Sequence, residues 1–219
     1  MIRLRKLYLA NRTFFTYFFL WYFLVSSIIF SLSKQDAFLL TNSAHHPFLD
    51  YFFTIITQFG DGLFVIAIAF ICFFLMSKRL GIAIATTYIT SGLFCSLLKR
   101  SFDLHRPAYT LQSDPDFHVI SWTPLAQHNA FPSGHTTSAF ALATTFALFC
   151  KNKKLGLIAL LLACLTGYSR VYLGQHYWDD VWFGSMLGLS FSCLYYLSFS
   201  YYLENNISFK SLSPPNFKI

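Results

Sequence analysis

The sequence predicts an all-α, polytopic membrane protein with six transmembrane helices and with amino and carboxyl termini in the cytoplasm. Three observations lead to this fold class: the composition, the long uncharged runs and the distribution of basic residues. Of the 219 residues, 55% are hydrophobic, 20% are aromatic and only 11% are charged, which is too apolar for an ordinary soluble domain. We expect residues 1–219 to form a single membrane-embedded domain.

Six apolar runs define the expected helices. They cover residues 13–33, 63–76, 80–98, 131–150, 155–169 and 181–203. Four of these runs approach the roughly 20 residues that cross a bilayer. The other two are shorter, and we expect the run 63–76 to extend backwards through residues 51–59 and the run 155–169 to continue past Arg170. The first run is longer than the core of a signal peptide, so we expect it to remain as an uncleaved helix.

The basic residues orient these helices, because cytoplasmic loops carry an excess of lysine and arginine. Eleven of the sixteen lysines and arginines fall in segments on one side of the predicted membrane. They are Arg3, Arg5, Lys6, Arg12, Lys78, Arg79, Lys151, Lys153, Lys154, Lys210 and Lys218. This pattern predicts the orientation of the helices, and we expect the membrane to be a bacterial cytoplasmic (inner) membrane. The excess of basic residues on the cytoplasmic side then accounts for the net charge of +7, and no nucleic-acid partner is implied. The tail 204–219 is expected to be flexible.

Three short polar blocks interrupt the apolar sequence. They cover residues 99–107, 132–135 and 169–180. Because successive connections alternate between the two sides of the membrane, all three blocks fall on the outer face. Charge is costly within a membrane protein, so charge gathered on one face indicates a functional site. The longest connection, residues 99–130, lies on the same face, and connections of that length are usually functional.

The third block contains a histidine and a carboxylate at helical spacing. His176 and Asp180 are four residues apart, so on a helix they share one face. A carboxylate bonded to one imidazole nitrogen fixes the tautomer and leaves the other nitrogen free to attack phosphorus. Asp179, at three-residue spacing, is an alternative partner. His135 opens the fourth expected helix and is suited to protonate a leaving oxygen as a general acid.

The remaining polar residues of the blocks are suited to bind a phosphate. Lys99, Arg106 and Arg170 supply three positive charges for its non-bridging oxygens, where charge develops during transfer. The backbone amides of Ser133 and Gly134 stand at the start of a helix, where unpaired donors and the helix dipole favour an anion. Together these residue types predict a phosphate-transfer site.

The blocks also resemble the three signature motifs of the type 2 phosphatidic acid phosphatase superfamily. They read Lys99-x6-Arg106-Pro107, Pro132-Ser133-Gly134-His135 and Ser169-Arg170-x5-His176-x3-Asp180. The resemblance implies that His176 is the nucleophile, that it forms a phosphohistidine, and that Asp180 rather than Asp179 orients it. Arg100 and His105 match no signature position, and we assign them no role.

The expected activity is the metal-independent hydrolysis of a lipid phosphomonoester or pyrophosphate on the periplasmic face. Candidate substrates are lipid A, undecaprenyl pyrophosphate, phosphatidylglycerophosphate and phosphatidic acid, with the first and second favoured. We expect the first external loop and residues 109–129 to select among them. No cofactor and no protein partner is expected, and the partners are the lipid phosphate and the surrounding lipids.

Three alternatives remain at this point. A lipid phosphotransferase would use the same phosphohistidine but pass the group to another lipid or sugar. A non-catalytic lipid-phosphate binder or transporter would use the cations without the chemistry. A zinc site on two histidines and an aspartate is chemically conceivable, although three nearby cations would repel a divalent ion.

Overall fold

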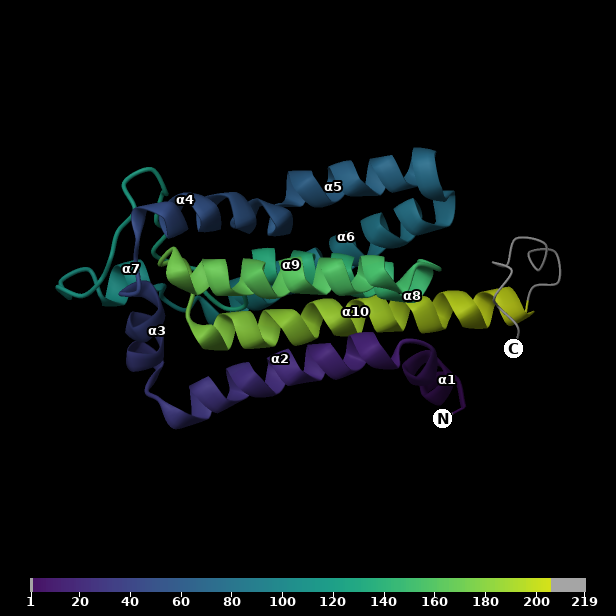
Figure 1. Cartoon of the computed structure of the whole chain (residues 1–219), viewed down its shortest axis with the longest axis horizontal. Helices are drawn as coiled ribbons and strands as arrows, with labels where there is room; N and C mark the ends of the chain where they lie inside the picture. Colours follow the sequence, from purple (N-terminus) through teal and green to yellow (C-terminus); the bar gives the residue numbers. More distant parts are fainter. Residues whose placement is uncertain (1, 206–219) are drawn as a thin grey trace.

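The computed structural model describes residues 2–205, which form helices and connecting loops without any β-strand (Figure 1). In chain order the helices are α1 (Ile2–Ala10), α2 (Arg12–Ser31), α3 (Lys34–Asn42), α4 (Pro47–Ile56), the 3-10 helix η1 (Thr57–Gly60), α5 (Gly62–Ile71), the π-helix η2 (Cys72–Met76), α6 (Lys78–Phe102), α7 (Pro107–Thr110), α8 (Gly134–Phe149), α9 (Lys153–Tyr172) and α10 (Trp178–Asn205). Residue 1 and residues 206–219 lie outside this description, and with them most of the tail that was predicted to be flexible.

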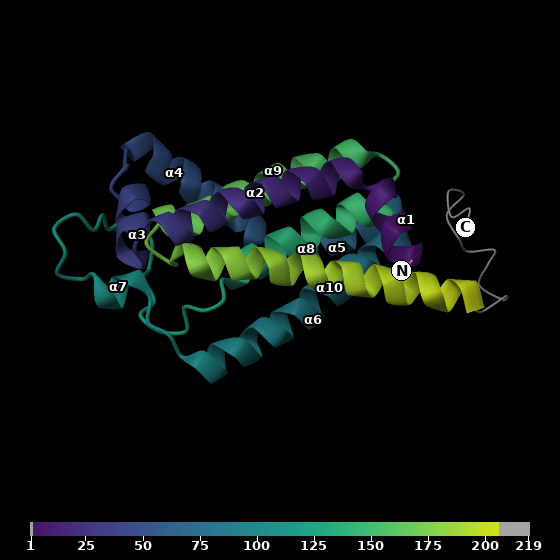
Figure 2. The ribbon, with the colours of Figure 1, turned by 90° about the horizontal axis from the view of Figure 1, so that it is seen from below.

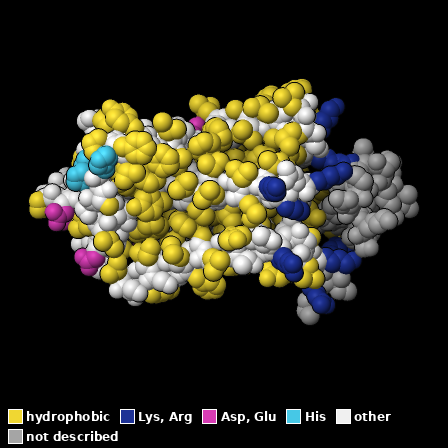
Figure 3. Space-filling view, viewed as in Figure 1, with side chains coloured by type: hydrophobic (Ala, Val, Ile, Leu, Met, Phe, Trp, Pro, Cys, Tyr) yellow, Lys and Arg dark blue, Asp and Glu magenta, His cyan; other side chains and the backbone are white. Residues whose placement is uncertain are grey.

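The long helices run side by side, so the molecule has two distinct ends (Figures 1 and 2). One end carries α3, α7 and residues 103–133, and we call it the loop end. The opposite end carries α1 and the last turns of α10, and we call it the basic end. In Figure 3, the lysines and arginines of the visible face gather at the basic end, whereas its acidic and histidine side chains lie toward the loop end.

Helix α8 lies inside the bundle and packs against α6, α9 and α10. Twelve of its 16 residues are buried. The approach of α10 depends on Gly188, because a Cβ atom there would collide with the carbonyl oxygen of Thr137. Small residues of this kind let two helix backbones come close in a membrane, where packing replaces the hydrophobic effect as the driving force for helix association.

Hydroxyl groups also join the helices around α8. Thr145 of α8 lies 3.2 Å from Thr87 of α6 and bonds Ser192 of α10 at 3.2 Å. Ser192 in turn donates to the carbonyl oxygen of Ala141 at 2.9 Å. All of these side chains are buried, so their polar atoms find partners within the protein, as the absence of water in a bilayer core requires.

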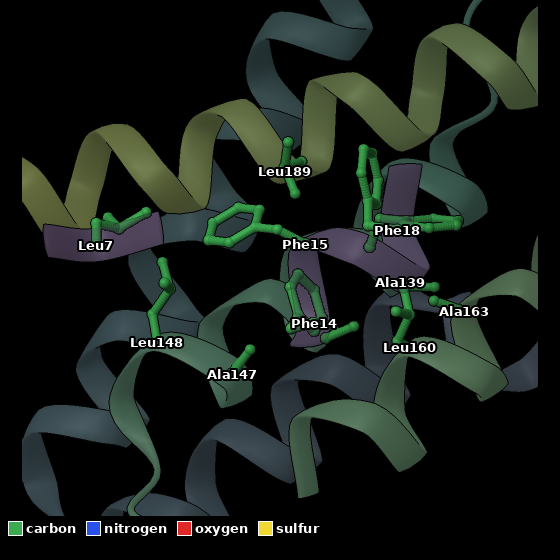
Figure 4. Packing of buried hydrophobic residues seen from close by; sticks show 12 residues of the cluster. Leu7, Phe14, Phe15, Phe18, Ala139, Ala147, Leu148, Leu160, Ala163 and Leu189 are labelled. Carbon is green, nitrogen blue, oxygen red and sulfur yellow. The ribbon is translucent and has the colours of Figure 1, made fainter. Parts of the chain in front are cut away.

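Aromatic residues of the first half of α2 pack into the interior of the bundle (Figure 4). Phe14, Phe15 and Phe18 are buried in one apolar cluster with Ala139 of α8, and with residues of α9 and α10. By contrast, large apolar side chains cover the outside of the molecule, among them Phe30 at 82% exposure and Leu63 at 80%. Such a surface suits contact with lipid and not with water.

The membrane spans agree in part with the sequence prediction. Helices α2, α6, α9 and α10 are each long and apolar enough to cross a membrane, and the segments Pro47–Gly60 and Gly62–Met76 form a fifth span if the pair, bent by 58°, is counted as one. The bend lies at Asp61, whose side chain accepts from the Leu63 amide at 2.8 Å and caps a new helix. The predicted backward extension of the run 63–76 is therefore interrupted there.

The remaining predicted span, the fourth in chain order at residues 131–150, corresponds to α8, which has only 16 residues. It is shorter than predicted because Ser133 caps the helix, accepting from the Thr136 amide, and the backbone is extended again at Cys150. Helix α9, in contrast, has 20 residues and runs past Arg170 as expected.

A buried polar network fixes the connections at the loop end. Asn42 donates from Nδ2 to the carbonyl oxygens of Tyr172, at 2.9 Å, and His118, at 3.1 Å, and its Oδ1 accepts from the His118 amide at 2.7 Å. The Tyr172 hydroxyl donates to Asp50 at 2.6 Å. This network ties α3 and α4 to the end of α9 and to the long connection 103–133.

Replacing Asn42 should therefore loosen the loop end. We expect Asn42→Ala to lower the free energy of unfolding by about 1–3 kcal/mol, because three backbone groups lose their partner in a buried position. Thermal unfolding in detergent would measure the effect, with Gln112→Ala, at an exposed position of the same connection, as the control. Equal unfolding temperatures for the two variants would contradict the assignment.

Candidate active site

His176 lies in the short turn between α9 and α10, at the loop end. The turn folds back on α9 because the amides of Gln175 and His176 both donate to the carbonyl oxygen of Arg170, at 3.0 and 3.1 Å. Gly174 permits this turn with a φ of +70°, a conformation that costs glycine little. The result is a histidine side chain that is only 2% exposed.

Asp180 holds one nitrogen of this histidine. Its Oδ2 lies 3.1 Å from His176 Nδ1 and also accepts from the Tyr177 amide at 3.0 Å. Among residues 2–205, no hydrogen bond is made by the other ring nitrogen, Nε2 of His176. Asp179 points elsewhere and pairs with Lys34 of α3 at 3.6 Å. Of the two carboxylates considered in the sequence, the structure brings Asp180 to His176.

Arg170 occupies the last turn of α9 and is only 8% exposed. Its guanidinium donates from NH1 to the Thr57 hydroxyl of η1 at 2.8 Å. Its Nε is buried without a hydrogen-bond partner among the described residues. A buried donor of this kind is costly to leave unpaired, so the position is suited to receive an acceptor oxygen from a ligand.

Arg106 is held by neutral oxygens of two separate segments. Its Nε donates to the carbonyl oxygen of His128 at 2.9 Å, and its NH1 donates to Gln175 Oε1 at 3.2 Å and to the Gln175 carbonyl oxygen at 3.3 Å. Gln175 is itself fixed by donating to the carbonyl oxygen of Pro124 at 3.0 Å. These contacts orient the guanidinium without neutralising its charge.

Lys99 is held in the same way. It lies in the last turn of α6, and its Nζ donates to the carbonyl oxygen of Asn129 at 2.6 Å. The same oxygen is 3.5 Å from NH2 of Arg106, so the carbonyl of Asn129 brings the two cations together. Arg100, the next residue, is exposed and takes no part in these contacts.

The second block starts α8 beside the His176–Asp180 pair. The Ser133 amide donates to the carbonyl oxygen of Asp180 at 3.0 Å, and the Ser133 hydroxyl accepts from Thr136 Oγ1 at 2.9 Å. The expectation that the Ser133 amide is free for an anion is therefore wrong in this structure, because it serves to join the two blocks. Gly134 borders open space, since a Cβ atom there would meet nothing within 4 Å.

Lys99, Arg106, Arg170 and His135 lie close enough to His176 to lower its pKa. Burial, followed by the positive charges of Arg106, Arg170 and Lys99 and by His135, holds the pKa of His176 well below its usual value of 6.5. The imidazole is therefore neutral at physiological pH, which is the form that has a free electron pair. Within residues 2–205, no group of three His, Cys, Asp or Glu side chains is arranged to hold a metal ion.

Sequence reasoning missed three residues of this site, namely Thr57, Asn129 and Gln175. Asn129 and Gln175 act at least in part through their backbone carbonyl groups. Every residue type carries a carbonyl group, so the residue types in the sequence could not reveal these contacts. Gln175 immediately precedes His176 and was visible in the third block, but an amide gave no chemical signal. Thr57 reaches Arg170 only because η1 packs against α9.

Comparisons with known proteins agree with this geometry. Residues 79–204, which contain all three blocks, match the PAP2 superfamily. The chain is 33% identical over 161 residues to the lipid A 1-phosphatase of Rhizobium etli, covering 64% of this chain and 67% of the relative. It also resembles the crystal structure of Aquifex aeolicus LpxE, with a TM-score of 0.66 and 30% identity over 74% of this chain and 93% of that one.

A second solved structure shares the fold over a larger part of the chain. It is a transmembrane PAP2-type phosphatidylglycerolphosphate phosphatase from Bacillus subtilis, with a TM-score of 0.65 and 24% identity over 90% of this chain and 98% of that one. The family match covers more than half of the 219 residues. This chain is a multi-pass membrane protein and belongs to the PAP2 superfamily.

Proposed function

We propose that this PAP2-type membrane lipid phosphatase hydrolyses a lipid phosphomonoester or pyrophosphate through a phosphohistidine formed on His176. The observation that carries the proposal is a neutral, buried histidine held by Asp180 and surrounded by Lys99, Arg106 and Arg170. A nucleophile with a free electron pair and three fixed cations supply what phosphoryl transfer requires, namely attack on phosphorus and stabilisation of the charge on its oxygens.

In the first step, Nε2 of His176 attacks phosphorus while the bond to the leaving oxygen breaks. His135, at the start of α8, donates a proton to that oxygen. Asp180 accepts the Nδ1 proton of His176 in a hydrogen bond and stabilises the positive charge that forms on the ring. Lys99, Arg106, Arg170 and the Gly134 amide bind the non-bridging oxygens, and Ser133 positions Gly134 through its bond to Asp180.

In the second step, water replaces the histidine. His135 takes a proton from the attacking water, the bond between phosphorus and Nε2 breaks, and inorganic phosphate leaves. The histidine returns to its neutral form, and no metal ion or other cofactor is needed, because no metal-bound hydroxide takes part. Transfer of the group to a second lipid instead of water would release no phosphate, which distinguishes a phosphotransferase.

We further propose that the chain crosses the cytoplasmic membrane of a bacterium six times, as one domain, with both termini inside and the loop end in the periplasm. The basic residues at the opposite end support this orientation. Among substrates, lipid A and undecaprenyl pyrophosphate are our first candidates, with phosphatidylglycerophosphate and phosphatidic acid next. The relatives named above include phosphatases of lipid A and of phosphatidylglycerolphosphate, which favours these two substrate classes.

The nucleophile assignment can be tested by substitution. His176→Ala and His176→Asn should each lower phosphate release by roughly 10³-fold or more, because neither side chain can form the covalent intermediate. His105→Ala, which removes an exposed histidine of the same end, serves as the matched control and should stay close to the parent. Size-exclusion chromatography would confirm folding. Turnover of the His176 variants within about tenfold of the parent would remove His176 from this role.

The three cations can be tested against a neighbouring one. Arg106→Ala and Arg170→Ala should each lower the rate by about 100-fold or more, as is usual when a preorganised charge donor is lost. Arg100→Ala removes the same charge from an exposed position of the first block and should be nearly silent. If Arg100 were as sensitive as Arg106, the register of the first block would be wrong.

Metal independence gives a test of the reaction type. Phosphate release from a panel of lipid phosphates should continue in millimolar chelator, because histidine is the nucleophile and the fixed cations repel a divalent ion. Orthovanadate should inhibit by occupying the position of the transferred group. Loss of turnover in chelator, with recovery on adding zinc or magnesium, would overturn the phosphohistidine mechanism.

A further inference from the structure

A large cavity lies at the basic end, far from the site described above. Its volume is about 620 Å³, which is within the range of sites that bind small molecules. Its polar lining includes Asn11, Ser77, Lys151 and Asn152 of the connections, Arg79 and Lys153 at the starts of α6 and α9, and Tyr196 of α10. Its apolar wall includes Leu80, Phe149 and Phe199. The lining of the cavity therefore combines basic side chains with apolar ones.

The positive charge of this cavity has no counter-charge among the described side chains. No acidic residue lines it, and within residues 2–205 no ion pair involves Arg79, Lys151 or Lys153. The acidic residues whose side chains are described lie elsewhere in the chain. They belong to α3, to α4, to the bend at residue 61, to the connection 103–133 and to the first turn of α10. Glu204 has a side chain outside the description, and residues 206–219 add two lysines and no acid.

One cation of the cavity is held by neutral atoms. Lys153 donates from Nζ to Asn11 Oδ1 and to the Ala147 carbonyl oxygen, both at 2.7 Å. Asn11 is only 6% exposed and is fixed by its own bond to the Leu7 carbonyl oxygen at 3.0 Å. These bonds hold the ammonium group in place while leaving its charge uncompensated. Arg79, at the start of α6, is half-buried and also lines the cavity.

We propose that this cavity binds an acidic phospholipid. The phosphate would contact Arg79, Lys151 and Lys153, and an acyl chain would lie along Phe149 and Phe199. Basic pockets between transmembrane helices bind anionic headgroups by this combination of charge and apolar contact. The apolar wall favours a lipid over free phosphate. In the orientation proposed above, the lipid belongs to the cytoplasmic leaflet, whereas the substrate belongs to the outer one.

The experiment compares two double variants of the full chain that lose the same charge. Arg79→Gln with Lys151→Gln removes two cations from the cavity lining. Lys78→Gln with Lys154→Gln removes two exposed cations that are neighbours in sequence but outside the lining. Native mass spectrometry in neutral detergent would count bound phosphatidylglycerol and, in parallel, phosphatidylcholine. Thermal unfolding without added lipid would show that both variants are folded.

We expect one phosphatidylglycerol to bind per chain in preference to phosphatidylcholine. The cavity variant should weaken that binding by about 20-fold or more, because each cation near a lipid phosphate contributes to the binding free energy. The control variant should weaken it by about twofold at most. Equal weakening by both variants would mean general attraction to a basic surface and would overturn the proposal. Equal binding of phosphatidylcholine, or displacement by millimolar inorganic phosphate, would overturn it as well. The result is independent of the catalytic mechanism, because neither variant touches the loop end.

Discussion

The close contact between α8 and α10 is the constraint on which the site depends. At Gly184, a Cβ atom would lie 2.9 Å from the carbonyl oxygen of Ser133, so a larger residue would push the start of α8 away. The Ser133 amide reaches the carbonyl oxygen of Asp180 only because the two helices are this close. The contact thereby joins the block around His135 to the block around His176, although about 40 residues separate them in sequence.

The cations of the site are oriented by carbonyl, amide and hydroxyl oxygens. Carbonyl oxygens of Asn129, His128 and Gln175 hold Lys99 and Arg106, and the Thr57 hydroxyl holds Arg170. A carboxylate in any of these places would orient the cation equally well but would cancel its charge. Among the described side chains, Asp180 is the carboxylate that contacts His176, and it binds the imidazole rather than a cation. The site therefore keeps a net positive charge, which under the proposed function would bind an incoming phosphate with little reorganisation during the reaction.

Much of this arrangement was predictable from the sequence. The alternation of apolar runs placed the three blocks on one side of the molecule, and the structure brings their residues together around His176. The four-residue spacing indicated that Asp180 could hold His176, and the structure shows that contact. Both predictions depended on the types of residue and on their spacing along the chain, and the tertiary packing is consistent with both.

Other features depend on contacts that carry no residue-type signal. The Asn129 carbonyl oxygen binds Lys99 because of where the connection runs, and any residue there has a carbonyl group. The Ser133 amide is occupied because α8 packs against the start of α10, a contact that a single apolar run does not reveal. The break at Asp61 was not predicted, because the sequence did not indicate that the Asp61 side chain caps a new helix rather than facing solvent.

The long connection at the loop end serves two purposes at once, and this limits how the protein can change over evolutionary time. Its carbonyl groups at residues 124, 128 and 129 fix Gln175, Arg106 and Lys99, while its exposed side chains face the solution from which a headgroup would approach. Under the proposed function, insertions or deletions in this connection that alter headgroup preference would also shift the carbonyl groups and slow the chemistry. Divergence toward new lipids should therefore proceed by exchanging exposed side chains at constant loop length, rather than by rebuilding the loop.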